Sequence, residues 1–383
     1  MELSIVIPCL NEAETIAICI NKAFDFLDRN NIDGEVIIAD NGSTDGSLEI
    51  AQKTRARIVA IEKKGYGSAL RGGINASTGK YIIMGDADDT YDFSALMPFL
   101  EKMRQGFEMV VGNRFLGGIE DGAMPFLHKY LGNPVLTAIG RLFYKSSCRD
   151  FHCGLRGFSR EAVLSLEASC PGMEFASELI VKAHLKGLKI TEVPTTLSKG
   201  GRTRSPHLNT WRDGWRHLRF LLLYSPRWLF FYPGIIMMIL GAVTGVPLVF
   251  SEISVGSVVF DIHTLFFASI FFILGCQTLG LSAISRIYAA QSNVLPRSEK
   301  MLRFMNWFNL EKFLLTGGSV FSAGVFSCLY SVVSWQRFSN FGDFDPRIGF
   351  RILIPAFTLM IVGVQIMFTS FTVELLSMKN EDR

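Results

Sequence analysis

The sequence KYIIMGDADD, residues 80–89, is an apolar run that ends in two acids separated by one residue, Asp86 and Asp88. Alternate side chains of an extended segment point to the same side, so these two carboxylates can reach one divalent cation together. Such a cation can bridge a diphosphate, and open α/β folds bind ligands at the carboxyl edge of their sheet. The pattern predicts a metal–diphosphate site. A solvated acidic turn is the alternative for an isolated Asp-x-Asp.

Strands and helices alternate along the chain up to these acids. Apolar runs typical of buried parallel strands cover residues 3–8, 35–40, 57–60 and 81–85. We expect a helix to open at Asn11 and Glu12, with acids in its first turn, and another helix after Gly65. The alternation predicts right-handed βαβ crossovers and a mainly parallel sheet. No Gly-x-Gly-x-x-Gly follows the first strand, which argues against a dinucleotide-binding Rossmann domain.

Composition argues against nucleic acid as a partner. The net charge is only +3, and no basic stripe with interleaved aromatic residues occurs in the first half of the chain. The seven cysteines form no Cys-x-x-Cys pair and no metal-binding spacing. An odd, scattered set of cysteines indicates reduced thiols in a cytosolic setting. We expect no secretory signal peptide, because the first apolar run is too short for one.

Several ordered segments resemble a known family. Residues 8–12, 40–45, 64–65 and 86–88 resemble the inverting family 2 glycosyltransferases of GT-A fold. Four further segments narrow the resemblance to the polyprenyl- and dolichyl-phosphate hexosyltransferase branch, which includes dolichyl-phosphate mannose synthase. These segments are residues 112–115, 150–156, 174–178 and 202–204. The resemblance covers about residues 1–225, and the motifs taken together in the right order are more specific than any one of them.

The resemblance implies roles at the donor end of the site. The residues that would line the base and ribose pocket are Pro8, Glu12 and Asp40. Lys64 would lie near the nucleotide, and Asp86 and Asp88 would bind Mg²⁺ or Mn²⁺ through the donor diphosphate. The chain departs from the family pattern at two positions. Asn41 replaces a usual acid, and Thr90 replaces a glutamine of the mannose synthases.

The resemblance also implies groups that hold phosphate. Arg114, Arg202 and Arg204 would bind phosphates of acceptor and donor, because one guanidinium group can donate hydrogen bonds to two phosphate oxygens at once. Further candidates for binding or orienting the acceptor are His128, Lys129, Asp150 and Glu178.

The candidate residues also have plain structural interpretations. Asp40 can anchor a turn, Arg114 can be a solvated surface charge, and Glu178 can be a surface acid on a helix. His152 and Cys153 are better explained as a loop histidine beside a buried thiol than as a metal site or a nucleophile.

The second half of the chain predicts a membrane domain. Long apolar stretches, each of the roughly 20 residues that a spanning helix needs, cover residues 228–250, 262–283, 313–335 and 352–376. Lysines and arginines concentrate between the second and third stretches, and by the positive-inside rule that loop is cytoplasmic. An even number of spans then puts both chain ends on the same side. We therefore expect a multi-pass protein of the inner membrane with a cytoplasmic catalytic domain.

Residues 206–227 predict an amphipathic helix between the two halves. Its apolar face consists of Trp211, Trp215, Leu218 and Leu222, and its basic face consists of Arg212, Arg216 and Arg219. A basic helix that carries tryptophan suits a membrane surface, and packing on the catalytic domain is the alternative. The predicted domains are a GT-A domain over residues 1–205, an interfacial segment over 206–227 and a four-helix transmembrane domain over 228–383.

These features together predict an enzyme that transfers a hexose from a nucleotide diphosphate sugar to polyprenyl phosphate. UDP-glucose is the preferred donor and GDP-mannose the next. A phosphate with a second pKa of about 6 is already charged near neutrality, so the acceptor needs no general base. One alternative is a membrane polysaccharide synthase with a hydroxyl acceptor, for which Asp150 is the best available base. Another is a non-catalytic lipid-carrier translocase or scaffold. Assembly into a homo-oligomer is left open.

Overall fold

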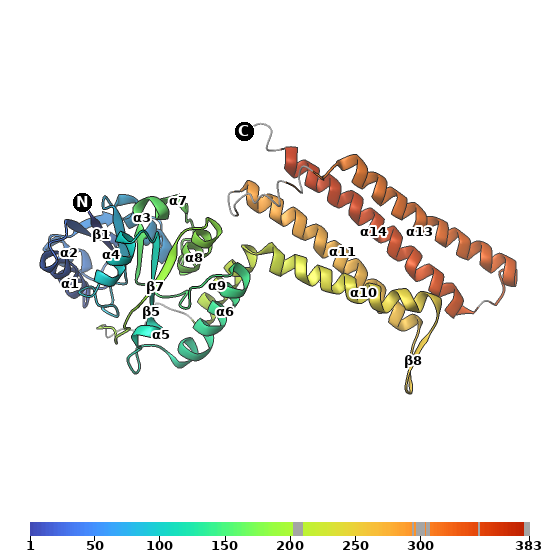
Figure 1. Ribbon diagram of the computed structural model, residues 1–383, viewed down its shortest axis with the longest axis horizontal. Helices are drawn as coiled ribbons and strands as arrows, with labels where there is room; N and C mark the ends of the chain where they lie inside the picture. The colour runs from blue at the N-terminus through green and yellow to red at the C-terminus, as the bar shows by residue number, and fades with distance from the viewer. Residues whose placement is uncertain (202–209, 293–294, 296–302, 304–306, 344, 379–383) are drawn as a thin grey trace. The chain divides into compact units, whose positions relative to one another are not determined.

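The structure is a computed structural model that describes residues 1–201, 210–292, 295, 303, 307–343 and 345–378. The chain divides into two compact units, Met1–Leu221 (unit 1) and Leu222–Arg383 (unit 2). Unit 1 contains a sheet flanked by helices, and unit 2 contains long helices and one short hairpin (Figure 1).

A seven-stranded sheet with strand order β3-β2-β1-β4-β6-β5-β7 forms the centre of unit 1. Its strands are β1 (Leu3–Cys9), β2 (Gly34–Asp40), β3 (Arg57–Ala60), β4 (Tyr81–Met84), β5 (Met109–Asn113), β6 (Arg156–Ser159) and β7 (Ile190–Pro194). β1 runs parallel to β2 and β4, β2 to β3, and β5 to β7. Only β6 is antiparallel to its neighbours, β4 and β5. The mainly parallel sheet expected for a GT-A domain is confirmed.

The central strands are buried because their sequences are apolar on both faces. β1, β4 and β5 are buried at every residue, as expected for strands covered by helices on both sides. The helices of unit 1 are α1 (Ile16–Arg29), α2 (Ser47–Gln52), α3 (Tyr66–Ala76), α4 (Met97–Arg104), α5 (Arg114–Gly117), η1 (His128–Gly132), α6 (Asn133–Tyr144), α7 (Arg160–Ser165) and α8 (Phe175–Leu185). A further helix, α9 (Thr210–Leu223), lies at the boundary with unit 2.

The first helix begins later than predicted. We expected it to open at Asn11 and Glu12, but α1 begins at Ile16 and has no acid in its first turn. Asn11 has a φ of 58°, in the left-handed region that an α-helix cannot use. The backbone amide of Asn11 donates to Ser43 Oγ (2.9 Å) and that of Glu12 donates to Ser47 Oγ (2.7 Å). Contacts with the loop after β2 and with the first residue of α2 therefore hold these residues in a turn.

Unit 2 contains four helices that are long and apolar enough to cross a membrane, among the residues described. They are α10 (Tyr232–Phe250) with the preceding turn η2 (Arg227–Phe231), α11 (Ile262–Gln291), α13 (Leu310–Ser339) and α14 (Pro346–Met378). Each of the four apolar stretches predicted from the sequence thus lies in a helix that is a candidate membrane span. A hairpin of β8 (Ile253–Val255) and β9 (Val258–Phe260) connects α10 to α11.

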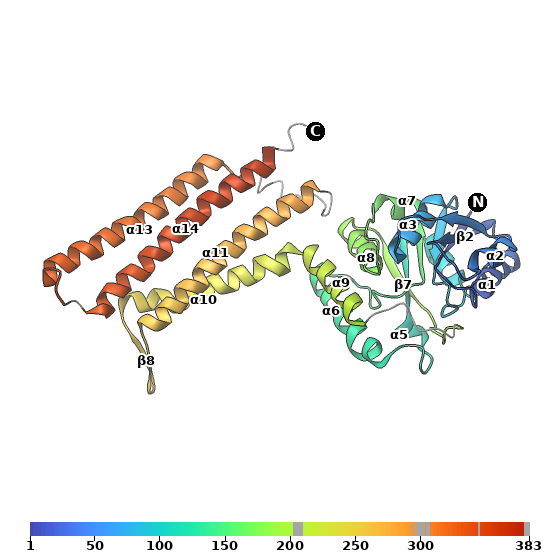
Figure 2. The ribbon, with the colours of Figure 1, turned by 180° about the vertical axis from the view of Figure 1, so that it is seen from behind.

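Glycines bring the helices of unit 2 into close contact. α10 packs on α11, α11 on α14, and α14 on α13, as Figures 1 and 2 show. A Cβ atom at Gly275 of α11 would lie 2.5 Å from the backbone nitrogen of Met238 in α10. A Cβ atom at Gly363 of α14 would lie 2.7 Å from the carbonyl oxygen of Gly317 in α13. Small residues at helix crossings are typical of membrane bundles, where close backbone packing drives association.

Gly275→Val should destabilise unit 2 by about 1–3 kcal/mol, because the added side chain would collide with backbone atoms rather than with movable groups. The measurement is the apparent melting temperature of the full-length protein in detergent. Gly318→Val is the matched control, since a Cβ atom there meets nothing within 4 Å. Equal losses in the two variants would contradict the role assigned to close packing at Gly275.

Candidate active site

The predicted site residues gather along one edge of the sheet. β1, β2 and β4 are parallel, with Cys9 paired to Asp40, so the segments that follow these strands leave from the same edge. β6 runs the other way and begins at Arg156, which pairs with Met84 at the end of β4. The connection that leads into β6 therefore reaches the same edge from the opposite direction.

Asp40 anchors the turn after β2. Its carboxylate accepts hydrogen bonds from the backbone amides of Gly42 (2.9 Å) and Ser43 (3.2 Å). Asp40 is also buried, so the turn-anchor interpretation is confirmed, while contact with a nucleotide stays a prediction. Pro8 and Glu12, the other residues predicted for the base and ribose pocket, lie in β1 and in the loop that follows it.

Asn41 holds a second loop, and its amide chemistry explains why an acid would not serve there. Its side-chain nitrogen donates to the carbonyl oxygens of Ile61 (3.0 Å) and Lys63 (2.9 Å), and its side-chain oxygen accepts from the amide of Gly65 (2.7 Å). A carboxylate could not donate to the two carbonyls. Lys64 Nζ donates to the backbone oxygen of Asn41 at 2.7 Å. The predicted nucleotide lysine is thus held beside the turn after β2.

The two acids after β4 are partly exposed and differ in their surroundings. Asp86 Oδ1 accepts a hydrogen bond from the Tyr66 hydroxyl at 2.8 Å. Burial, together with the Asp86 carboxylate, holds the pKa of Tyr66 well above its usual value, so the phenol remains a donor. Asp88 Oδ1 accepts from the Thr90 hydroxyl at 2.6 Å. Thr90, one of the two departures from the family pattern, thus orients the second acid of the motif.

Gly154 brings the connection before β6 against Asp86. A Cβ atom at Gly154 would lie 2.3 Å from Asp86 Oδ2 and 3.0 Å from the ring of Tyr91. Its backbone amide donates to the Tyr91 hydroxyl at 2.9 Å. A larger residue at this position would displace the Asp86 carboxylate, so the backbone of Gly154 forms one wall around the acid.

The donor set at this edge suits a divalent ion shared with a substrate. Among the residues described, no group of three or more His, Cys, Asp or Glu side chains could hold a metal by itself. Asp86 and Asp88 supply two carboxylates, and Mg²⁺ is commonly held by one or two carboxylates together with substrate phosphates. These residues therefore fit an ion that binds with a diphosphate rather than a permanent metal centre.

Arg114 is a buried ion-pair partner, so its interpretation as a solvated surface charge is wrong. It is only 8% exposed and lies at the start of α5. Its Nε donates to Asp150 Oδ2 and its Nη2 donates to Asp150 Oδ1, both at 2.7 Å. Asp150 is fully buried and also accepts from the Arg114 backbone amide at 3.1 Å. Both oxygens of Asp150 are thus engaged with one arginine.

Arg156 is a structural residue of this edge that sequence reasoning missed. It is fully buried, and its guanidinium donates to the carbonyl oxygens of Phe151 (2.7 Å), Cys153 (2.8 Å) and Ala176. These bonds tie the connection before β6 to the start of α8. The arginine inside the Asp150–Arg156 motif was visible in the sequence, but nothing there distinguished a buried arginine from a phosphate ligand.

Glu178 is buried and structural, which corrects its interpretation as a surface acid. Its carboxylate accepts from the amides of Ser169 (3.0 Å) and Cys170 (2.7 Å) and pairs with Lys182 Nζ at 2.8 Å. The next residue, Pro171, accepts from the amide of Gly67 at 2.9 Å, at the start of α3. Glu178 thus fixes a loop that caps α3. An acceptor-orienting role for it stays a prediction.

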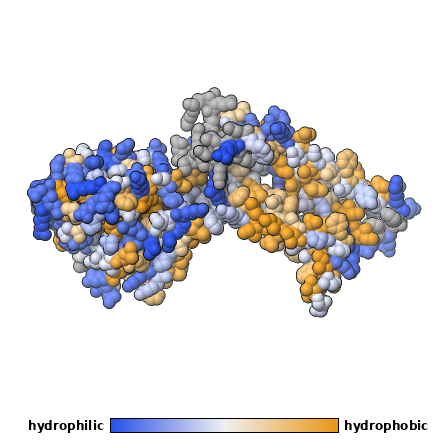
Figure 3. Space-filling model, in the orientation of Figure 1, coloured by the Kyte–Doolittle hydropathy of each residue, from blue (hydrophilic) through white to orange (hydrophobic). Residues whose placement is uncertain are grey.

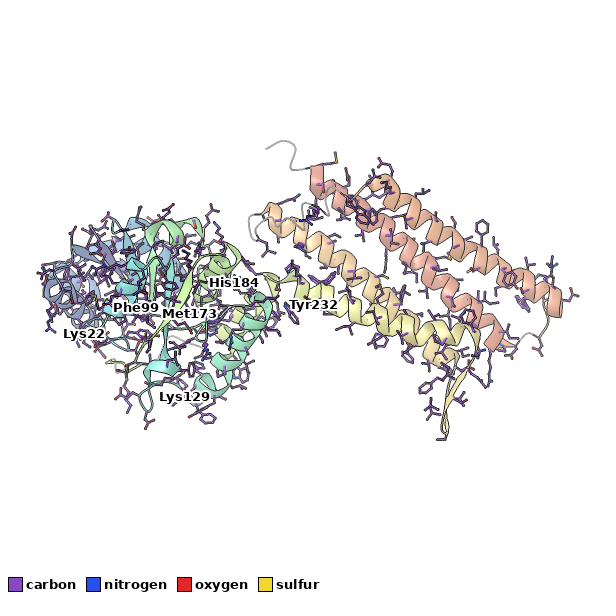
Figure 4. All side chains as sticks on the ribbon, viewed as in Figure 1. Lys22, Phe99, Lys129, Met173, His184 and Tyr232 are labelled. Carbon is purple, nitrogen blue, oxygen red and sulfur yellow. The ribbon has the colours of Figure 1, made fainter. Side chains whose placement is uncertain are left out.

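The remaining predicted residues of the acceptor and phosphate site lie on η1 or outside the described residues. His128 and Lys129 are half-buried on η1, and Figure 4 labels Lys129 there. Burial and the charge of Arg114 lower the pKa of His128. Arg202 and Arg204 lie outside the residues that the structure describes. The residue before them, Gly201, donates its backbone amide to the carbonyl oxygen of Asp88 at 3.1 Å.

Helix α9 packs on unit 1 through a mixed face, in which Phe220 and Leu221 are buried together with polar side chains, and it exposes its tryptophans. Asp213 and His217 are buried, and a hydrogen bond of 2.9 Å joins His217 Nδ1 to the Ser177 hydroxyl in α8. Trp211 is 78% exposed and Trp215 is 58% exposed. Packing on the catalytic unit, the alternative in the sequence, therefore coexists with exposed tryptophans.

A second exposed apolar surface lies next to α9. Tyr144 of α6 donates its hydroxyl to the carbonyl oxygen of Leu221 in α9 at 2.8 Å. The exposed apolar side chains on and around η1 and α6 are Phe126, Leu127, Tyr130, Leu131, Val135 and Leu142. Both α6 and its neighbour α9 therefore carry exposed apolar side chains, a feature of α6 that the sequence analysis did not predict.

Comparison with known proteins identifies the family. Residues 4–166 match glycosyl transferase family 2, and residues 283–377 match the glycosyltransferase family 2 C-terminal transmembrane region. The chain is 36% identical over 371 residues to the low-salt glycan biosynthesis hexosyltransferase Agl6 of Haloferax volcanii, covering 96% of this chain and 87% of that relative. The chain belongs to glycosyltransferase family 2.

Other relatives of this family 2 glycosyltransferase match a smaller share of the chain, at lower sequence identity. A dolichyl-phosphate hexose transferase of Haloferax volcanii is 28% identical over 193 residues, which cover 50% of this chain and 81% of that protein. The glucosyl-3-phosphoglycerate synthase of Mycobacterium tuberculosis, solved with Mn²⁺, UDP and glucosyl-3-phosphoglycerate, is 23% identical, with a TM-score of 0.47. That match covers 58% of this chain and 79% of the synthase. At that TM-score the likeness supports no inference about ligands.

Removing one member of the Arg114–Asp150 pair should be costly. Asp150→Asn should lower the free energy of unfolding of this glycosyltransferase by about 3–5 kcal/mol, because it leaves a buried guanidinium uncompensated. Thermal unfolding of the full-length protein provides the measurement. The double variant Arg114→Met/Asp150→Leu should lose less than the sum of its two single variants. Additive losses would contradict a direct buried pair.

The docking of α9 should weaken in acid. Burial lowers the pKa of His217 from 6.5 to about 4, so the unfolded state binds the proton more tightly. The resulting stability is fully present above about pH 6.5 and falls by up to about 3 kcal/mol as the pH drops toward 4. Hydrogen exchange of α9 amides, corrected for intrinsic rates, should show this loss. His217→Gln, which can keep a bond to Ser177, should give a shallower pH dependence, and an unchanged slope would refute the assignment.

Proposed function

We propose that this glycosyltransferase transfers a hexose from a nucleotide diphosphate sugar to a polyprenyl phosphate at the cytoplasmic face of the membrane. UDP-glucose is the preferred donor and GDP-mannose the second. The observation that carries the proposal is the pair Asp86 and Asp88 at the carboxyl edge of the sheet, in a chain that also contains four candidate membrane spans. The names of the two Haloferax relatives, a hexosyltransferase and a dolichyl-phosphate hexose transferase, support the same reaction class.

The donor site would be built from the turns after β1, β2 and β4. Asp86 and Asp88 would hold Mg²⁺ or Mn²⁺, and a divalent ion supplies neutralisation of the leaving diphosphate when bound. Tyr66 and Thr90 each donate a hydrogen bond to one of these acids, which keeps the carboxylates oriented. Pro8, Glu12, Asp40 and Lys64 would contact the nucleotide.

The acceptor would attack as an anion, so the protein must bind and aim it rather than deprotonate it. Arg114 would use Nη1 for this, since its Nε and Nη2 are engaged with Asp150. Arg202, Arg204, His128 and Lys129 would complete the phosphate site. In an inverting reaction the acceptor oxygen bonds to the anomeric carbon from the face opposite the departing diphosphate, which carries away the electron pair of the broken bond.

The base predicted for the hydroxyl-acceptor alternative is engaged in a buried ion pair. Asp150 was the best candidate, but it is fully buried, and both of its oxygens accept hydrogen bonds from Arg114. A general base must reach the proton that it abstracts. This observation favours an acceptor that is already ionised over a sugar hydroxyl.

The membrane would hold the lipid acceptor close to the site. The exposed Trp211 and Trp215 on α9, beside arginines of the same helix, suit a lipid surface with anionic head groups. The exposed apolar side chains of η1 and α6 would lie on the same surface. The lysines and arginines between α11 and α13 favour the cytoplasmic side for that connection, and so for unit 1.

The decisive experiment offers the purified full-length protein polyprenyl phosphate with Mg²⁺ or Mn²⁺ in detergent. Radiolabelled UDP-glucose and GDP-mannose are supplied separately, and label is followed into organic-extractable lipid. Metal-dependent label in lipid from one donor is the expected result. Label that transfers only to an added sugar hydroxyl would favour a polysaccharide synthase, and no transfer at all would favour a translocase or scaffold.

Asp88→Asn should reduce this transfer by at least about 100-fold, because it removes one of the two carboxylates predicted to hold the ion. Asp92→Asn is the matched control, since Asp92 is exposed and its carboxylate accepts a hydrogen bond from the amide of Ser94. Transfer that survives in Asp88→Asn as in Asp92→Asn would refute the metal role. Melting temperatures of both variants separate lost chemistry from lost folding.

A further inference from the structure

The short hairpin between α10 and α11 has an apolar face whose side chains are all exposed, most of all toward the tip. In the hairpin, Ile253 pairs with Phe260, and Val255 pairs with Val258. Because side chains alternate along a strand, these four residues lie on one face. Their exposed fractions are 37% for Ile253 and Phe260, 62% for Val255 and 52% for Val258. An isolated two-stranded hairpin is marginally stable in water, so an exposed apolar face of this kind calls for a cover.

The hairpin connects two candidate membrane helices with almost no linker. α10 ends at Phe250 and β8 begins at Ile253, while β9 ends at Phe260 and α11 begins at Ile262. Two residues reach at most about 7 Å, which is about the thickness of one interfacial layer of a bilayer. If α10 and α11 span the membrane, the base of the hairpin lies at the lipid–water boundary.

Ion pairs fix the base of the hairpin to another helix. Asp261, between β9 and α11, pairs with Arg351 of α14 at 2.6 Å and with Arg347 at 3.7 Å. Glu252, next to β8, pairs with Arg347 at 3.8 Å. These contacts hold both ends of the hairpin at the rim of the helices in unit 2, and the charged side chains are confined to its base.

We propose that the face formed by Ile253, Val255, Val258 and Phe260 lies in the lipid–water interface and anchors α10 and α11 at this depth. Apolar residues, orange in Figure 3, occur both on the hairpin and on the surface of unit 2 beside it, and the two helices that the hairpin joins are themselves apolar enough to span a membrane. A second copy of the chain that paired along a strand edge would satisfy backbone groups but leave this face uncovered. A lipid surface covers the face itself and needs no hydrogen bonds from it.

The test uses the full-length protein with a nitroxide spin label at Val258→Cys, reconstituted in phosphatidylcholine–phosphatidylglycerol vesicles. Collision with oxygen, which concentrates in lipid, is compared with collision with a water-soluble nickel complex. Ser254→Cys, on the opposite face of the same hairpin, is the matched control, and label on the native cysteines is subtracted with the unmutated protein. The oxygen-to-nickel ratio should be at least about threefold higher at position 258 than at 254.

Equal ratios at the two positions, with free access of the nickel complex, would overturn the proposal. Spin–spin broadening at position 258 would also overturn it and would identify a second copy as the cover. If Val258→Cys does not fold, Val255→Cys carries the same measurement, because Val255 is its cross-strand neighbour on the same face.

Discussion

The buried ion pair between Arg114 and Asp150 is the interaction on which the arrangement of the candidate site depends. Arg114 follows β5, and Asp150 lies in the connection that leads into β6. Glu192 of β7 strengthens the same junction by accepting hydrogen bonds from the amides of Arg149 (2.6 Å) and Asp150 (3.0 Å). Three strands are thus joined at one end, which sets the path of the chain toward Gly154 and Asp86. A paired charge with low exposure can fix such a path because breaking it would leave an ion in the interior.

At this edge of the sheet, the turns that follow the parallel strands and the connection that leads into antiparallel β6 are held in place by different kinds of side chain. The turns after β1, β2 and β4 are held by short polar side chains, such as Asp40 and Asn41, that bind backbone groups. The connection before β6 is held instead by two buried arginines, Arg114 and Arg156. The first set leaves the Asp86 and Asp88 carboxylates partly exposed, while the second keeps positive charge beneath the surface. Such a division suits the proposed reaction, in which the donor and the acceptor are both anions.

Much of the architecture could be predicted from the sequence, because it follows from local patterns. Apolar runs and turn residues were enough to predict the first four strands, and length and hydropathy were enough for the four spans. The predicted start of α1 was wrong because a long-range contact of Asn11 with the loop after β2 keeps this part of the chain out of the helix. The antiparallel direction of β6 and the burial of Arg114, Arg156 and Glu178 were not predictable for the same reason. The local sequence around a charged residue does not show whether its side chain is solvated, binds a substrate or forms a buried ion pair.

The ion pairs at the base of the hairpin have a consequence for how the chain enters a membrane. Arg347 and Arg351 belong to the last helix, whereas Glu252 and Asp261 flank the hairpin near the start of unit 2. In the proposed topology these arginines cross to the side that positively charged segments usually avoid. Their acidic partners are synthesised first and are already there to receive them. In that topology the hairpin between α10 and α11 can therefore bind α14 through these ion pairs as α14 is inserted. Insertion of the fourth span would then depend on correct insertion of the first two.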